Sequence, residues 1–139
     1  MRVLLDTNVV LDVLLARKPF VHPAAQIFGL VEQSRIEGFL GATTVTTVEY
    51  LLTQSLPRAT AYAALHRLLE FFEIAPVNRA VLEEALQSKI ADFEDAVLEQ
   101  AGRLVGVEAI LTRDPKGFRY SAIKVFDPVE FLAFREKAN

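Results

Sequence analysis

The chain has 139 residues and no cysteine, with 15 lysines and arginines against 18 aspartates and glutamates. A chain of this length makes about one domain, residues 1–139, and buries roughly two-thirds of the surface that its unfolded form exposes. Because cysteine is absent, disulfide bonds and thiolate metal sites are excluded. Any metal site would use carboxylates or the two histidines, which points to hard cations.

No segment approaches the roughly 18 apolar residues of a membrane span. The N-terminus begins with strand-like sequence and not with a targeting signal, so we expect a cytoplasmic protein. The hydrophobic share of 52% and the mean hydropathy of +0.27 are high for a small domain. This excess predicts a protein partner or self-association.

Apolar runs, helical spacing and turn residues predict alternating strands and helices. In chain order they are strand 2–5, helix 9–16, helix 24–36, strand 39–42, a helix capped by Thr43 or Thr44 and running to Leu56, helix 59–72, strand 73–77, helix 79–88 capped by Asn78, helix 93–105 capped by Asp92 and closed by Gly106, strand 108–111, strand 122–126 and helix 128–137. The connections are too long for hairpins, which predicts an α/β fold with a parallel sheet covered by helices.

Two acids directly follow predicted strands. Asp6 follows the first strand, and Asp114 follows the fourth within Thr112-Arg113-Asp114-Pro115. In a parallel sheet both would lie at the same edge, where ligands bind in open α/β sheets. Taken alone, Asp6 can also be explained as a turn residue and Asp114 as part of an Asp-Pro turn.

Glu49 is predicted to lie on an apolar helix stripe, four residues after Val45 and three before Leu52. A carboxylate in such a place needs a cation, a basic side chain or a proton. The alternative is that Glu49 reaches solvent from the edge of the stripe.

Asp92, Glu94 and Asp95 crowd the start of one helix. Capping and the helix dipole explain any two of these acids. Three exceed what capping needs, and Asp95, one turn before Leu98, is predicted to point partly inward.

If these acids converge, they require compensation, because two carboxylates 4 Å apart at an effective dielectric near 20 repel by roughly 4 kcal/mol. Mg²⁺ or Mn²⁺ would supply it and would activate a water molecule toward a phosphodiester. No Ser, His or Cys constellation and no glycine-rich phosphate loop competes, and His22 and His66 are expected on helix surfaces.

The net charge of -3 at first disfavours a nucleic-acid substrate. However, if one site gathers Asp6, Glu49, Asp92, Asp95 and Asp114, the remaining acids are fewer than the 15 basic residues. The rest of the surface would then be slightly positive, which is compatible with a nucleic-acid substrate.

Four motifs in order resemble a PIN domain over nearly the whole chain, from Met1 to about Phe134. They are Leu-Leu-Asp6-Thr7-Asn8, Thr-Thr-Val-Glu49, Asp92-Phe-Glu-Asp95-Ala96 and Leu-Thr112-Arg-Asp114. The resemblance implies a three-layer α/β/α fold with a small central parallel sheet and an Mg²⁺- or Mn²⁺-dependent ribonuclease. It further implies a toxin of a toxin-antitoxin pair, of the VapC type.

By position, the resemblance makes Asp6, Glu49, Asp95 and Asp114 the catalytic, metal-binding acids. It makes Asp92 an accessory acid, and it makes Asn8 and Thr112 residues that hold the acids by hydrogen bonds. Family members often carry one more acid where this chain has Gly117, so a second metal ion is expected to be weakly held or absent.

Two alternatives stay open. A phosphatase of the haloacid-dehalogenase type also begins with a strand ending in Asp, but it needs a second Asp where this chain has Asn8. The other alternative is a non-catalytic module whose acids bind a basic partner.

The segment 51–72 is unusually apolar, and we expect part of it to form a symmetric dimer contact or the groove for an antitoxin helix. The alternative is that most of its apolar residues fill the core. They are Leu51, Leu52, Leu56, Tyr62, Leu65, Leu68, Leu69, Phe71 and Phe72. A dimer would set two acidic sites along one RNA cleft, flanked by Arg17, Lys18, Arg113 and Lys116.

Overall fold

The computed structural model describes residues 1–138 and contains a five-stranded parallel sheet of order β3-β2-β1-β4-β5. The strands are β1 (Arg2–Leu5), β2 (Glu37–Gly41), β3 (Glu73–Ala75), β4 (Ala109–Leu111) and β5 (Lys124–Phe126). The helices are α1 (Thr7–Leu14), α2 (Val21–Glu32), α3 (Ala42–Ser55), α4 (Arg58–Phe71), α5 (Arg79–Leu86), α6 (Phe93–Leu104), the 3₁₀ helix η1 (Pro115–Phe118) and α7 (Pro128–Ala138). The predicted parallel sheet is confirmed.

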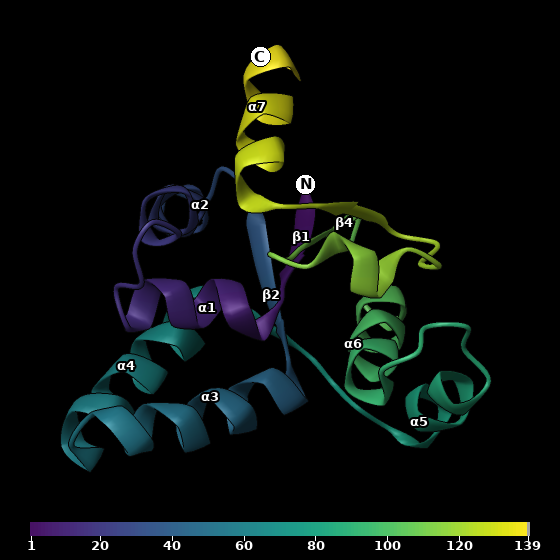
Figure 1. Cartoon of the computed structure of the whole chain (residues 1–139), viewed down its shortest axis with the longest axis horizontal. Coiled ribbons are helices and arrows are strands. Elements are labelled where there is room, and N and C mark those ends of the chain that lie inside the picture. The colour runs from purple at the N-terminus through teal and green to yellow at the C-terminus, as the bar shows by residue number, and fades with distance from the viewer. Residues whose placement is uncertain (139) are drawn as a thin grey trace.

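Alternate residues of each strand enter two separate cores, as the period of a strand requires. Val3 and Leu5 pack in the core under α1 to α4, which also takes Phe131 of α7. Leu4 and Ile110 pack in the second core, under α5, α6 and η1. Figure 1 shows α1 to α4 on one side of the sheet and α5 and α6 on the other, so the expected three-layer α/β/α arrangement is confirmed.

The boundaries of the first two helices differ from the prediction. The first helix begins at Thr7 and not at residue 9, because the Asp6 side chain caps it. It ends before Ala16, which has a left-handed φ of 49°. The second helix begins at Val21, not at residue 24, and ends before Ser34, whose φ is 57°.

The second strand and the start of the third helix also differ. Gly38 lies within β2, where an added Cβ would be 2.7 Å from the Phe72 ring, so only glycine fits. The predicted caps Thr43 and Thr44 were wrong, because α3 begins at Ala42 without a side-chain cap. Thr44 is buried instead, and its Oγ1 accepts a hydrogen bond from Thr7.

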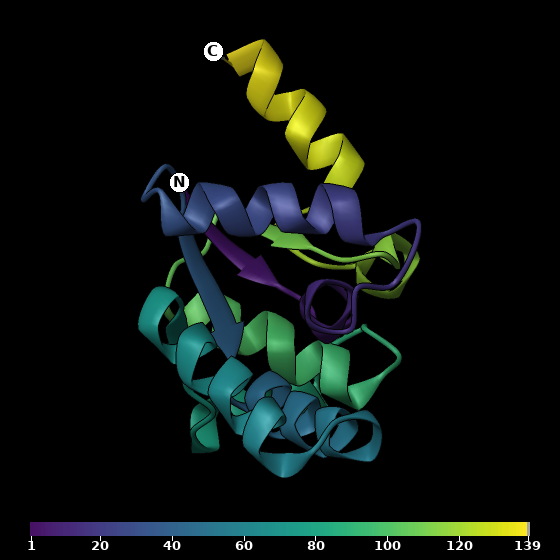
Figure 2. The same ribbon diagram turned by 90° about the vertical axis from the view of Figure 1, so that its left-hand side faces the viewer.

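The remaining elements lie within a few residues of their predicted bounds, although strands 73–77, 108–111 and 122–126 are shorter than expected. The Asn78 and Asp92 caps are confirmed, and Gly106 closes α6 with a φ of 70°. The 3₁₀ helix η1 was not predicted. Figure 2 shows α7 standing out from the body of the domain. Among the described helices none is both long and apolar enough to cross a membrane.

Candidate active site

Asp6 lies at the carboxyl end of β1, beside the end of β4. Leu5 is in register with Leu111, and the Asp6 N–H donates to the Leu111 carbonyl at 2.9 Å. Its carboxylate is held from two sides, because Oδ1 accepts from the Thr7 N–H and Oδ2 from the Thr112 hydroxyl, both at 2.8 Å. Asp6 is therefore fixed at the sheet edge where the sequence placed it.

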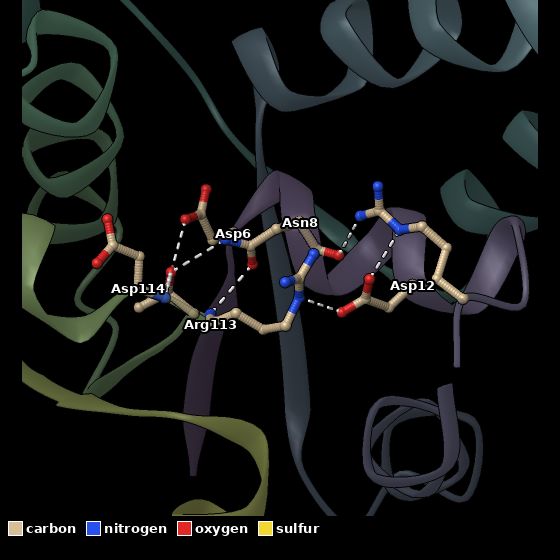
Figure 3. Close-up of polar contacts among 7 residues, drawn as sticks. Asp6, Asn8, Asp12, Arg113 and Asp114 are labelled. Carbon is tan, nitrogen blue, oxygen red and sulfur yellow. Dashed lines mark hydrogen bonds and ion pairs between the residues drawn. The ribbon is translucent and has the colours of Figure 1, made fainter. Parts of the chain in front are cut away.

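Thr112 and Asn8 join the chain after β4 to Asp6 through hydrogen bonds. Figure 3 shows Asp6, Asn8, Arg113 and Asp114 gathered at this point. The fully buried Thr112 hydroxyl accepts from the Asp114 N–H at 3.0 Å and from Asn8 Nδ2 at 3.4 Å. Asn8 Oδ1 accepts from the Arg113 N–H at 3.2 Å. The hydroxyl thus uses its donor and both acceptor positions, and segment 112–114 is held against the first strand.

Asp92 and Asp95 reach the same region from the start of α6. Asp92 Oδ1 accepts from the Asp95 N–H at 3.0 Å, which fixes the first turn of the helix. A Cβ added to Gly117 would lie 3.1 Å from Asp95 Oδ2 and 3.2 Å from Asp114 Oδ2. The carboxylates of Asp95 and Asp114 therefore approach one point above η1.

The acids form one electrostatic cluster. Burial is the main cause that raises the pKa of Asp95 to about 7, and the negative charges of Asp6, Asp92, Asp114 and Glu94 contribute to the same rise in that order. Burial is also the main cause that raises the pKa of Asp6, against the lowering effect of its hydrogen bonds. A cation between these groups would remove the mutual repulsion.

Glu49 has another partner in the structure. Its Oε2 accepts a hydrogen bond of 2.7 Å from the Tyr62 hydroxyl of α4, which raises the pKa of Tyr62. The face of α3 next to Asp6 and Asp95 carries threonines, namely Thr43, Thr44 and Thr47. The structure thus brings together Asp6, Asp92, Asp95 and Asp114 and leaves Glu49 outside the cluster.

The donor set suits a divalent cation, although residues 1–138 contain no ready-made group of three Asp, Glu or His side chains arranged to hold one. Two carboxylates face one point beside Gly117, and Asp6 is close enough to raise the pKa of Asp95. Mg²⁺ and Mn²⁺ prefer such oxygen ligands and complete their shells with water. These acids would therefore supply the oxygen ligands of a metal site.

A buried ion cluster behind the acids was missed by sequence reasoning. Asp12 of α1 is fully buried and accepts from Arg17 Nε at 2.9 Å and from Arg113 Nε at 2.6 Å (Figure 3). Arg17 Nη2 also donates to the Asn8 carbonyl at 3.2 Å. The available signal was an Asp within the otherwise apolar run from Val9 to Leu15.

Four basic residues were predicted to flank the site, and the structure separates them into two kinds. Arg17 and Arg113 are partly buried and fixed by Asp12. Lys18 and Lys116 are exposed, the latter in η1 between Asp114 and Gly117. Only the arginines have a fixed geometry next to the acids.

The sequence matches the PIN domain family model over residues 2–116. Since this match spans most of the chain, the protein belongs to the PIN domain family, as the motifs predicted. A curated relative is Ribonuclease VapC1 of Aquifex aeolicus (strain VF5), which is 24% identical over 135 residues, covering 94% of this chain and 92% of the relative.

Two solved structures share the fold. DNA-bound VapBC from Salmonella typhimurium aligns with a TM-score of 0.71 at 15% identity, covering 92% of this chain and 98% of that one. A toxin-antitoxin complex from Klebsiella pneumoniae aligns with a TM-score of 0.69 at 21% identity, covering 91% of this chain and 97% of that one. These similarities confirm the three-layer architecture.

Proposed function

We propose that this protein is an Mg²⁺- or Mn²⁺-dependent endoribonuclease that hydrolyses RNA phosphodiester bonds, acting in the cytoplasm as the toxin of a toxin-antitoxin pair. The observation that carries the proposal is the approach of the Asp95 and Asp114 carboxylates to one point, beside Asp6. Membership of the PIN domain family and the similarity to Ribonuclease VapC1 support it.

In this proposal Asp6, Asp95 and Asp114 hold the divalent ion. When bound, the ion neutralises their charges, activates a water molecule and stabilises the charge that develops on the phosphate. Thr112 and Asn8 keep Asp6 and segment 112–114 in place through the hydrogen bonds described above.

Asp92 and Glu49 have different roles at the proposed metal site. Asp92 keeps the first turn of α6 in position by its cap and adds negative charge to the cluster. Glu49 is the fourth acid of the motif and would join the metal site by exchanging its bond to Tyr62 for one to the ion or to a water on it. Loss of the Tyr62 bond on addition of Mn²⁺ would support this part, and its persistence would remove Glu49 from the ligand set.

Cleavage of RNA in the presence of Mg²⁺ or Mn²⁺, and its loss on chelation, test the proposal directly. Asp6→Asn should lower the rate by orders of magnitude with the fold intact, since it removes a ligand and no core contact. Glu37→Gln is the matched control, because Glu37 is an exposed acid that pairs with Arg2. Undiminished cleavage by Asp6→Asn would overturn the assignment, whereas Mn²⁺ binding without any cleavage would favour the non-catalytic acidic module.

The predicted partner surface is divided between core and exterior. Leu52, Leu65, Leu68 and Phe72 are buried in the core, as the simpler alternative expected. Leu51, Leu69 and Phe71 stay exposed, at 36%, 51% and 37%. The buried residues explain part of the apolar excess, and the exposed residues leave surface for a partner.

An apolar cavity of about 210 Å³ lies at Phe71, one of these exposed residues. It is lined mainly by side chains of α1, α2 and α4, namely Val13, Leu14, Phe28, Ala64, Leu68, Phe71 and Phe72, with Glu32 and Arg67 at its edge. We assign it to an amphipathic antitoxin segment, in keeping with the toxin-antitoxin complex of the same fold. Phe71→Glu should abolish that binding and leave RNA cleavage unchanged, while Glu70→Gln should affect neither.

The exposed apolar residues of segment 51–72 would also form the contact of a homodimer. It would set two acidic sites along one RNA cleft, flanked by Arg17, Lys18, Arg113 and Lys116. Sedimentation at micromolar concentration tests it. A strictly monomeric protein would remove the dimer and leave the antitoxin as the partner of this surface.

A further inference from the structure

A second cavity, of about 330 Å³, lies between the start of α2 and the start of α7. Phe20, Pro23, Arg113, Asp127, Pro128 and Val129 line it. Phe20 is 40% exposed and Val129 is 64% exposed, so two apolar walls stand open to solvent. The volume falls within the range of about 300–1000 Å³ that is typical of small-ligand sites, and its walls suit a flat ring with a polar edge.

Arg113 connects this cavity to the acids. It lies between Thr112 and Asp114, and its backbone N–H is held by Asn8. Its Nε donates to Asp12, and its guanidinium carbon lies 4.0 Å from the centroid of the Phe20 ring. Within residues 1–138 the terminal amino groups of Arg113 make no hydrogen bond. Arg113 is therefore a fixed cation with free donors, and it lies between this cavity and the acid cluster.

Asp127 places a negative charge on another wall. Its Oδ1 accepts from the Glu130 N–H at 2.8 Å, and Glu130 Oε1 accepts from the Asp127 N–H at 3.1 Å, which forms a capping box on α7. Its Oδ2 makes no hydrogen bond to any described residue. Among the described residues, Asp127 and Arg113 form no ion pair within 4 Å.

Two opposite charges thus face one cavity without neutralising each other. A ligand that satisfies both must carry an anion at one end and N–H donors at the other, with an aromatic ring between. A nucleotide has this arrangement, since its phosphate would meet Arg113 and its base would pack against the part of the Phe20 ring that Arg113 leaves exposed.

The base that fits Asp127 best is guanine. Its N1–H and its 2-amino group are neighbouring donors and match the two acceptor oxygens of a carboxylate. Uracil offers one N–H between two carbonyl oxygens, which a carboxylate repels. The chemistry of this wall therefore discriminates between bases.

We propose that this cavity is a subsite for one nucleotide of the RNA beside the cleaved bond, and that Asp127 selects guanine there. This inference rests on the proposed ribonuclease function, because it names the substrate feature that the same site would read. Arg113 contacts the phosphate, Phe20 and Val129 hold the ring, and Asp127 accepts the two hydrogen bonds.

Titration with mononucleotides tests the subsite without the metal reaction. Guanosine 5′-monophosphate should bind the parent at least about tenfold more tightly than uridine 5′-monophosphate, as is typical of a bidentate base contact. Asp127→Asn should lose this preference and keep the fold, because Asn caps a helix as well as Asp does. Glu130→Gln, which alters the same capping box outside the cavity, should keep the preference, while Phe20→Leu should weaken both nucleotides alike.

Cleavage-site mapping on RNA of random sequence provides the second measurement. The parent should show guanine enriched at one position next to the cut, and Asp127→Asn should cut with that enrichment lost. Equal affinity for the two nucleotides, or cleavage without base preference, would overturn the guanine subsite and leave the ribonuclease proposal intact. Failure to cleave any RNA with either metal would overturn both.

Discussion

The hydroxyl of Thr112 donates a 2.8 Å hydrogen bond to Oδ2 of Asp6, across the carboxyl ends of two neighbouring strands. The same oxygen accepts from the Asp114 N–H. One small side chain thus positions one acid directly and another through its backbone, so its effect on the site should be measurable apart from that of the acids.

Thr112→Val should reduce both stability and activity. It leaves Asp6 Oδ2 and the Asp114 N–H without their partner, at a cost of about 1–3 kcal/mol in the free energy of unfolding. Loss of the hydroxyl also raises the pKa of Asp6 further, because that bond lowers it. Denaturant unfolding and RNA cleavage measure the two effects, and Thr112→Ser, which keeps the hydroxyl, should restore most of both. Equal behaviour of the Val and Ser variants would contradict this role.

Asp95 should make the metal-free protein less stable at high pH. Its pKa is about 7 in the folded state against 3.8 as the ordinary value, so between these limits the folded state binds a proton that the unfolded state lacks. The contribution of Asp95 to the free energy of unfolding is therefore lost as the pH rises through 7, and it is recovered as the pH falls toward 4.

Asp95→Asn should accordingly raise the melting temperature of the metal-free protein at about pH 8, by an amount that shrinks steadily as the pH falls toward 4. Mg²⁺ should stabilise the parent at the higher pH and the variant much less. A metal-free variant that melts below the parent at pH 8 would show that Asp95 serves mainly the start of α6, where an acid interacts well with the helix dipole.

Asp12→Ala should destabilise the fold by about 3 kcal/mol, since it breaks a buried ion cluster and leaves two guanidinium groups facing each other. Glu37→Ala breaks the exposed pair with Arg2 and should cost less than about 1 kcal/mol. Denaturant unfolding of the two variants under the same conditions gives the comparison. Similar small losses would mean that the arginines find equivalent partners in solvent.

Gly117→Asp should add a carboxylate beside Asp95 and Asp114, because a Cβ at this position already lies within 3.2 Å of an oxygen of each. The metal-free variant should melt lower than the parent, and it should bind Mn²⁺ more tightly in a calorimetric titration. Gly117→Asn adds the same bulk without the charge and is the control. If the Asp variant binds Mn²⁺ no more tightly than the Asn variant, position 117 does not face the ion.

The sequence was most informative where local pattern and sheet geometry coincide. Asp6 and Asp114 follow strands, and a parallel sheet brings strand ends together whatever the details of the loops. Asp92 and Asp95 were placed by helix-start chemistry, which is also local. The family motifs added Thr112, whose hydroxyl contact to Asp6 depends on a strand pairing that no local signal specifies.

The features that the sequence did not predict depend on contacts between residues that are not close in the chain. The Asp12 cluster joins residues 5 and 101 positions apart, so no helical spacing reveals it. The apolar stripe pointed to Glu49, yet the acids that the structure buries are Asp12 and Glu99, among the residues described. Glu49 accepts its hydrogen bond from Tyr62, 13 positions away on another helix, and helical spacing does not specify that contact. The Thr43 and Thr44 caps misplaced the start of α3, because a helix can begin at Ala42 without a side-chain cap.

The bond between Thr112 and Asp6 spans 106 positions of the chain. During synthesis the first strand leaves the ribosome long before β4. Asp6 therefore lacks its hydrogen bond to Thr112 until nearly the whole domain has emerged. An unfinished chain therefore lacks the assembled acid cluster, and a premature stop before Thr112 yields a fragment without it. If the proposed activity holds, the ribosome that makes this protein is not exposed to the nuclease until synthesis of the domain is almost complete.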